Sequence, residues 1–207
     1  MAKVDKQIFP KREPLPRTWF LSRGYKKADP AHTNGYAIWL HPETNNVLNQ
    51  YGQRMALQLI PYEKFKQNTT RYLKLSRQHG SMYLARLKYL TFIGPIPEGC
   101  TIDHIDGNTL NNSIDNLRAV TPEINRRDGG FLRKLRNHGI NVAMYHTSII
   151  LEGFENMAKW KASHTEYRYK RLTRTELLRF FLGDDFRVDT RSSDEIMLDE
   201  MTHHQEI

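Results

Sequence analysis

Hydrophobic and polar residues alternate in different ways along the 207-residue chain. In the N-terminal part, β-like apolar runs at 36–41, 55–60 and 70–75 are separated by polar segments rich in Pro, Asn, Gly and Ser. The segment 83–92 repeats leucines at helical spacing and stops before a Gly-Pro pair, which ends helices. This pattern predicts a small antiparallel sheet with one helix packed against it.

The C-terminal part lacks proline, the residue that most strongly interrupts helices. All nine prolines lie at or before Pro122. Thr173 and Glu176 have the spacing of a capping box and precede an apolar run, as at the start of a helix. Residues 138–183 are therefore predicted to be helical, and the predicted fold class is α+β.

A third pattern lies between these two parts, at 100–137. Apolar runs that begin at 102 and 117 flank a polar segment in which Asp-Gly-Asn at 106–108 reverses the chain. Residues 121–123 then supply a capping hydroxyl, a proline for the first helical position and an acidic first turn. We expect a β-hairpin followed by a helix, an arrangement that brings together His104, Asn116 and Asn125.

Charge is distributed as unevenly as proline. Lys and Arg outnumber Asp and Glu by 31 to 23, which gives a net charge of +8. Residues 1–99 carry +10 and 126–182 carry +7, whereas 100–125 carry −3 and 183–207 carry −6. This balance favours a polyanionic partner such as nucleic acid, although a solvated cationic face would give the same totals.

Several classes of protein are excluded by what the sequence lacks. Cys100 is the single cysteine, so an intrachain disulfide and a thiolate zinc site are both excluded. No apolar run approaches the ~18 residues of a membrane span, and the N-terminus lacks the apolar core of a signal peptide. We therefore expect a cytoplasmic protein without a membrane partner or a small-molecule cofactor.

The polar stretch resembles the signature of the HNH, or His-Me finger, endonucleases, and most closely the phage-type HNH homing endonucleases. It reads Asp-His-Ile-Asp-Gly-Asn at 103–108 and Asp-Asn-Leu-Arg-Ala-Val-Thr at 115–121. Asn116 follows His104 by 12 positions, and Asn125 follows Asn116 by 9. With the similar helix and Pro-containing loop before the motif, the resemblance begins at Arg86, and it implies a central ββα-metal fold.

The resemblance also implies a role for each motif residue. His104 would be the general base that activates water, since an imidazole titrates near neutral pH. Asp103 and the side-chain oxygen of Asn125 would hold one divalent cation, and ligation by oxygen alone suits Mg²⁺ or Mn²⁺ rather than zinc. Asn116 would tie the loop to the hairpin and keep His104 aimed at the water. The positions of Asp103 and Asn125 are often His in this family, which weakens any analogy with its His-rich, zinc-binding members.

Cationic residues lie within and directly after the motif, next to a site that would accept a phosphodiester. We expect phosphate contacts from Arg118, Arg126, Arg127, Arg133, Lys134 and Arg136. In 138–183, basic residues are interleaved with Trp and Tyr. This region is either a DNA-reading module or a helical pair whose aromatics form the core, and the sequence leaves both open.

The sequence thus divides into five segments. They are a basic extended arm at 1–18, a β-rich region with a helix at 19–99 that is expected to contact DNA, the HNH motif at 100–137, the helical region at 138–183 and an acidic, flexible tail at 184–207. We expect a monomeric, metal-dependent homing-type endonuclease that nicks double-stranded DNA in a bacterial or phage-infected cell. Two alternatives stay open: a DNA-binding regulator with an inactive motif, and an HNH nuclease of restriction or phage packaging.

Overall fold

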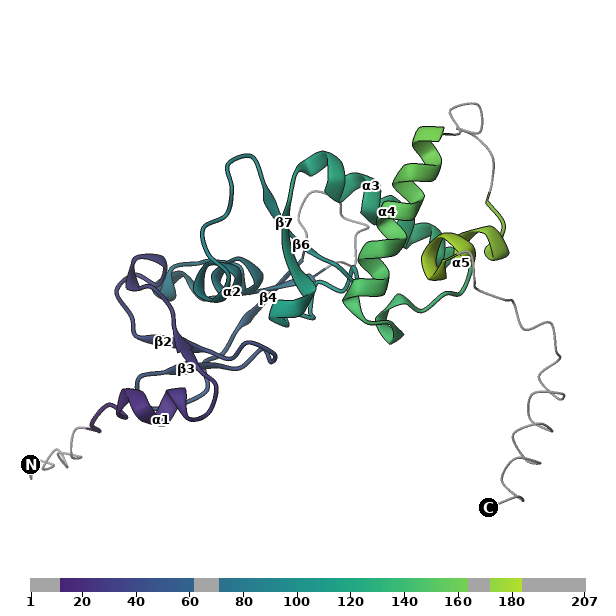
Figure 1. Ribbon diagram of the computed structural model, residues 1–207. Coiled ribbons are helices and arrows are strands. Elements are labelled where there is room, and N and C mark those ends of the chain that lie inside the picture. Colours follow the sequence, from purple (N-terminus) through teal and green to yellow (C-terminus); the bar gives the residue numbers. More distant parts are fainter. Residues whose placement is uncertain (1–11, 62–70, 164–171, 184–207) are drawn as a thin grey trace, which may run out of the picture.

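Short strands occupy the first half of the molecule and longer helices the second half (Figure 1). The computed structural model describes residues 12–61, 71–163 and 172–183. The helices are α1 (Arg17–Leu21), α2 (Leu84–Phe92), α3 (Pro122–Asn137), α4 (Thr147–Ser163) and α5 (Arg174–Leu182). The strands are β1 (Lys26–Lys27), β2 (Ile38–Leu40), β3 (Val47–Asn49), β4 (Gln58–Pro61), β5 (Arg71–Lys74), β6 (Thr101–His104) and β7 (Leu117–Val120).

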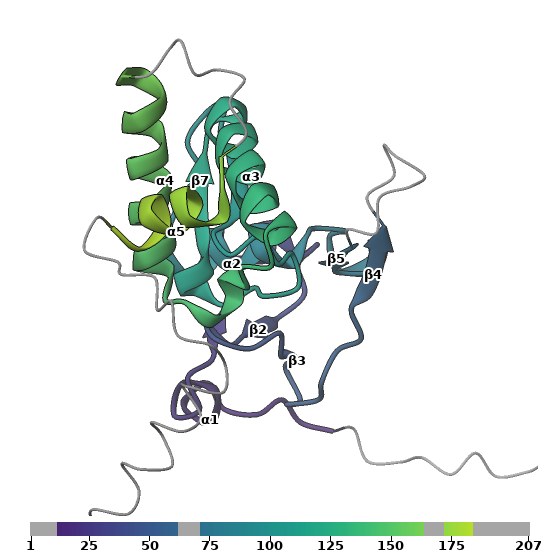
Figure 2. The same cartoon turned by 90° about the vertical axis from the view of Figure 1, so that its right-hand side faces the viewer.

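The N-terminal strands form two antiparallel units instead of the single predicted sheet. Strands β1, β2 and β3 pair in that order, while β4 and β5 form a separate hairpin. Figure 2 shows this hairpin set apart from β2 and β3. The runs at 36–41 and 70–75 contain β2 and β5, and the run at 55–60 overlaps β4. Strands β1 and β3 have only two and three residues, too few to produce an alternating pattern in the sequence.

Helix α2 covers the three-stranded sheet, as predicted. Leu84 and Leu87 of α2 are fully buried in one cluster with Ile38, Leu40 and Val47 of the sheet. Helix α1 packs on the same region through Phe20, whose ring stacks on Trp39 with centroids 4.1 Å apart. The predicted extended arm at 1–18 therefore ends inside α1, and its residues 1–11 lie outside the described residues.

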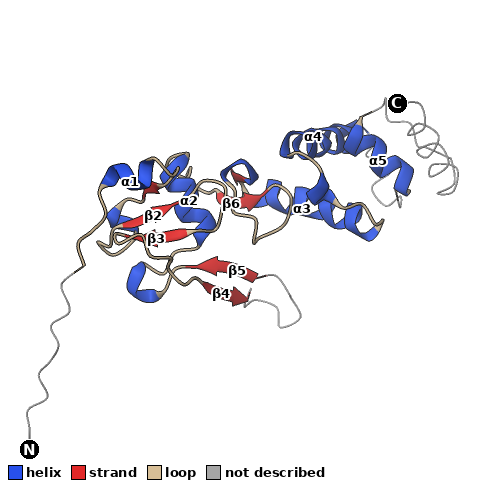
Figure 3. Cartoon of the chain, turned by 90° about the horizontal axis from the view of Figure 1, so that it is seen from below, coloured by secondary structure: helices blue, strands red, loops and turns tan. Residues whose placement is uncertain are grey.

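The β6–β7 hairpin and α3 form where the polar motif predicts them. Asp103 lies opposite Arg118 in the antiparallel register, and His104 lies opposite Leu117. Helix α3 begins at Pro122, and the Thr121 hydroxyl accepts a hydrogen bond from the Ile124 amide at 3.4 Å. Figures 1 and 3 both show the hairpin between the N-terminal strands and helices α3 to α5.

Helices α3, α4 and α5 share a core that also receives Ile105, the residue that follows β6. The capping box at Thr173 and Glu176 is confirmed, with both hydrogen bonds present. Trp160 packs at the edge of this core against Phe180, as expected if these aromatics are structural. Residues 164–171 and the acidic tail at 184–207 lie outside the described residues. None of the described helices is long and apolar enough to cross a membrane.

Candidate active site

The His104 side chain lines a pocket of about 340 Å³, which we call the His104 pocket. Four elements supply its walls: β5, the start of α2, β6 and the first turn of α3. The lining residues are Tyr72, Tyr83, Ala85, Arg86, Thr101, Ile102, His104 and Asn125. Two of the motif residues, His104 and Asn125, thus meet in one cavity although they are far apart in sequence.

The imidazole of His104 is held by Asn112, a residue of the polar loop. Its Nε2 lies 3.1 Å from Asn112 Oδ1, and both side chains are buried, with 4% and 2% exposed. The Asn112 amide cannot be reversed, because its Nδ2 donates to the Leu110 carbonyl and to Asn45 Oδ1. An amide oxygen only accepts, so Nε2 carries the proton and Nδ1 keeps the lone pair. The base of this site would therefore be Nδ1.

Burial also decides the protonation state of His104. Desolvation lowers its pKa below the ordinary value of 6.5, and the hydrogen bond to Asn112 and the charges of Asp106 and Asp103 oppose this effect only in part. The imidazole is consequently neutral at neutral pH, as a general base must be before it accepts a proton.

A buried lysine forms a hydrogen bond with the backbone of Asn112. Lys88 of α2 has no exposed surface, and its ammonium donates to the backbone carbonyls of Asn112 and Thr44. Burial lowers the pKa of Lys88 to about 8, against the raising effect of Glu43. Through its bond to the Thr44 carbonyl, Lys88 therefore links the N-terminal region to the polar loop that holds His104.

Asn116 fixes the turn that follows His104. Its Oδ1 accepts from the Asp106 amide at 3.0 Å, and its Nδ2 donates to Asp106 Oδ1 at 2.9 Å and to the Asn111 carbonyl at 2.8 Å. The Ile105 amide also donates to the Asn116 carbonyl. Asn116 thus makes the contacts that the orienting role requires, and that role stays a prediction.

Asp103 faces away from His104, because consecutive residues of a strand point to opposite faces. Both bonds to Asp103 come from Arg118, whose Nε and Nη2 donate to its Oδ2 at 3.1 and 2.9 Å. The same Nη2 donates to Asp128 Oδ2 at 2.8 Å, and Asp128 on α3 is 1% exposed. Burial raises the pKa of Asp103, while the hydrogen bond and charge of Arg118 lower it.

The residues present fit a hard divalent cation held by few protein ligands. Asn125 lines the His104 pocket, and it stands one turn before Asp128, which shares the Arg118 guanidinium with Asp103. Arg118 binds only Oδ2 of Asp103, so Oδ1 is the oxygen that could hold a cation. No group of three or more His, Cys, Asp or Glu side chains that could hold a metal occurs among the described residues. The side-chain oxygens of Asp103 and Asn125 are the type of ligand that hard divalent cations take.

The structure does not place the predicted phosphate-binding residues on one surface. The Arg118 guanidinium is 4.8 Å from the Phe154 ring centroid and bonded to two carboxylates, so it lies inside the site. Arg126, Arg127 and Lys134 line a pocket on the α4 side of α3. Arg136 lines a separate hollow beside Gly107, and Arg133 is exposed.

Reasoning from the sequence assigned no role to four residues of the site: Asn112, Asp128, Lys88 and Arg86. Asn111 and Asn112 are adjacent and identical in type, so the pattern does not tell which one reaches His104. Asp128 could have been found, since it follows Asn125 by three positions on one helix face. Nothing in the sequence distinguishes Lys88 and Arg86 from the ordinary basic residues of a surface helix.

Comparisons with known proteins find relatives of this chain, and the family match includes His104, Asn116 and Asn125. A family model described as HNH endonuclease matches residues 83–127. Protein 3.8 of Escherichia phage T7 is 62% identical over 32 residues, 16% of this chain and 26% of that protein. YosQ of the SPbeta prophage of Bacillus subtilis (strain 168), which carries the name of an HNH homing endonuclease, is 40% identical over 68 residues, 33% of this chain and 34% of that protein.

An uncharacterized HNH endonuclease of Acanthamoeba polyphaga mimivirus is 49% identical over 47 residues, 22% of this chain and 25% of that protein. The solved structure of the HNH homing endonuclease I-HmuI, described as showing DNA binding and cleavage, aligns at 27% identity over 52% of this chain and 57% of that chain, with a TM-score of 0.34. The chain spans only about a quarter to a third of the length of these sequence relatives. The match to the HNH endonuclease family model covers residues 83–127, and the chain is similar to these phage, prophage and viral proteins over part of its length.

Proposed function

We propose that this protein is an HNH endonuclease that hydrolyses phosphodiester bonds of double-stranded DNA. The observation that carries the proposal is the geometry of His104, a buried imidazole whose Nε2 lies 3.1 Å from Asn112 Oδ1, so that Nδ1 would be available as the base. Nδ1 would take the proton of a water that attacks phosphorus, and the bond from phosphorus to the 3′ oxygen would break.

The remaining residues of the site would bind and orient the substrate. Arg86 brings a positive charge to the same pocket as His104, where it would hold the phosphodiester that is cut. Asp103 and Asn125 would hold one Mg²⁺ or Mn²⁺ ion, which when bound would supply Lewis-acid stabilisation of charge on the phosphate and the leaving oxygen. Arg118 and Asp128 keep the Asp103 carboxylate in a fixed orientation.

One base and one cation site per chain favour cleavage of one strand per event. We therefore propose a monomeric, homing-type nickase that acts in the cytoplasm of a bacterial or phage-infected cell. The match of residues 83–127 to the family model, together with the phage and prophage relatives, supports this proposal. The alternative is a DNA-binding regulator with a silent motif, against which the bonded, buried state of His104 and Asn116 argues.

A plasmid assay tests the proposal. Supercoiled plasmid incubated with the protein and Mg²⁺ should become relaxed, and EDTA should stop this conversion. His104→Ala should leave the plasmid supercoiled while it binds DNA like the wild type. Binding without any cleavage by the wild-type protein, on plasmid and on DNA of the source genome, would support the regulatory alternative instead.

A further inference from the structure

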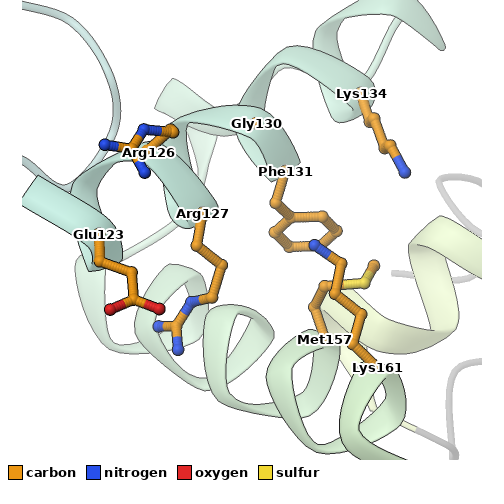
Figure 4. Close-up of a pocket in the computed structure, with 8 residues that line it drawn as sticks. All are labelled: Glu123, Arg126, Arg127, Gly130, Phe131, Lys134, Met157 and Lys161. Carbon is orange, nitrogen blue, oxygen red and sulfur yellow. The ribbon is translucent and has the colours of Figure 1, made fainter. Parts of the chain in front are cut away.

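A second pocket lies on the opposite side of α3 from its contact with the hairpin. Its volume is about 370 Å³, and it shares no lining residue with the His104 pocket. We call it the α3–α4 pocket, and its walls are Glu123, Arg126, Arg127, Gly130, Phe131, Lys134, Met157 and Lys161. Figure 4 shows the Phe131 ring between the side chains of Arg127 and Lys134, with the Lys161 side chain extending toward it from α4.

Helical periodicity brings these residues to one cleft. Arg127, Gly130 and Lys134 follow one another at intervals of three and four, so they form a stripe along α3. Met157 and Lys161 are one turn apart on α4 and complete the facing wall. The pocket is therefore built by two helices whose packing is fixed by their shared core.

The pocket carries positive charge that its own carboxylates do not balance. Four cationic residues line it against a single acid, Glu123. The neighbouring Asp128 is already bonded to Arg118 and to Arg127 Nε. Burial lowers the pKa of Lys161, and the positive charges of Lys134 and Arg127 lower it further. An anion in this cleft would relieve the repulsion among the cations.

The floor of the pocket is apolar and open. Phe131 and Met157 are each 2% exposed. Gly130 lies inside α3, where glycine is an unfavourable residue, and a Cβ built on it would meet no atom within 4 Å. Packing therefore does not require glycine here, and its missing side chain keeps the cleft wide. The space is suited to an anion that carries an apolar group, such as a sugar-phosphate unit.

We propose that the α3–α4 pocket binds a backbone phosphate of the DNA strand, with the adjoining deoxyribose against Phe131 and Met157. This inference rests on the proposed function, since it takes DNA as the substrate. Arg127, Lys134 and Lys161 would contact the phosphate oxygens, and the contact would be independent of base sequence. Because α3 carries Asn125 on one side and this pocket on the other, the DNA would be anchored on both sides of the helix that enters the active site.

Salt-dependent binding tests the proposal. Fluorescence anisotropy with a labelled mixed-sequence duplex, in EDTA to prevent cleavage, gives the slope of log K against log salt concentration. Lys161→Gln should weaken binding and reduce the slope by about 1, as expected for one lost phosphate contact. The matched control Lys159→Gln, an exposed lysine of α4 outside the pocket, should bind with the slope of the wild type.

A second pair of variants changes the shape of the pocket without changing its charge. Gly130→Leu should fill the cleft and weaken DNA binding. Gly129→Leu should not, because Gly129 lies outside the pocket, although a Cβ added there would also meet open space. Both replace glycine inside a helix, so circular dichroism should show an equally folded protein.

The outcomes separate this proposal from the proposed function. If Lys161→Gln and Gly130→Leu bind DNA with the affinity and slope of the wild type while plasmid cleavage still requires His104, the pocket proposal is overturned and the nuclease stands. If these variants lose binding but the wild type cleaves no DNA, the pocket stands and the nuclease does not. Tight binding of thymidine monophosphate in the pocket, without any effect on duplex binding, would overturn the assignment to a DNA strand.

Discussion

Asn112→Ala should slow DNA cleavage, because it removes the acceptor that fixes the His104 ring. In the wild type the Nε2–H of His104 donates to Asn112 Oδ1 at 3.1 Å in a buried environment. A buried donor without an acceptor costs about 1–3 kcal/mol. This penalty disfavours the form in which Nδ1 is the base. Since ~1.4 kcal/mol corresponds to a tenfold change in rate, we expect single-turnover cleavage to fall roughly 10- to 100-fold.

Asn112→Asp separates the effect of orientation from that of charge. The carboxylate can still accept from Nε2–H, but its negative charge beside the imidazole should raise the pKa of His104. Cleavage requires the neutral imidazole, and burial keeps its pKa below 6.5 in the wild type. The acidic limb of the rate–pH profile should therefore move to higher pH in this variant, while the plateau rate stays above that of Asn112→Ala.

The matched control is Asn108→Ala, in the same loop. Asn108 is exposed, and its Oδ1 accepts from the Leu110 amide without touching His104. This variant should cleave at the wild-type rate. Cleavage by Asn112→Ala at the wild-type rate at saturating DNA, with an unchanged pH profile, would show that Asn112 does not orient His104.

Three further predictions concern the neighbours of this network. Asn116→Ala leaves the Asp106 amide and the Asn111 carbonyl without their partner, and urea unfolding should show a loss of about 1–3 kcal/mol. Arg86→Gln should lower the cleavage rate with little change in the free energy of unfolding, and Arg86→Lys should restore part of the rate. The folded-state pKa of Lys88 is about 8 against 10.5 unfolded, so the unfolded chain binds more protons between these values and stability should rise with pH there. Urea unfolding at several pH values should show that, relative to Lys88→Met, the wild-type protein gains up to ~3 kcal/mol of unfolding free energy across this pH range. Plots of unfolding free energy against pH that run parallel for the two proteins would contradict the lowered pKa.

The hairpin and α3 could be predicted from the sequence because local chemistry specifies them. The Asp-Gly-Asn turn, the Thr121 cap and Pro122 act within a few residues of the structure that they determine. The capping box at Thr173 is local in the same way. The two N-terminal antiparallel units could not be separated, because the sequence pattern indicates strands but does not tell which neighbouring strands pair.

The candidate site could be predicted in its residues more than in its contacts. His104 and Asn125 come together in one pocket because the hairpin and helix place them there. The pairing of Arg118 with Asp103 follows from a register that the sequence does not reveal, so Arg118 was expected to meet DNA. Lys88 belongs to the site only because α2 packs against the polar loop, a tertiary contact with no local signal.

If His104 is the base of a DNA-cleaving site, its removal must slow plasmid nicking in Mg²⁺, measured as a single-turnover rate. His104→Ala should bind the plasmid with wild-type affinity and nick it about 10²- to 10⁴-fold more slowly. Nicking by His104→Ala at the wild-type rate would show that His104 is not the base.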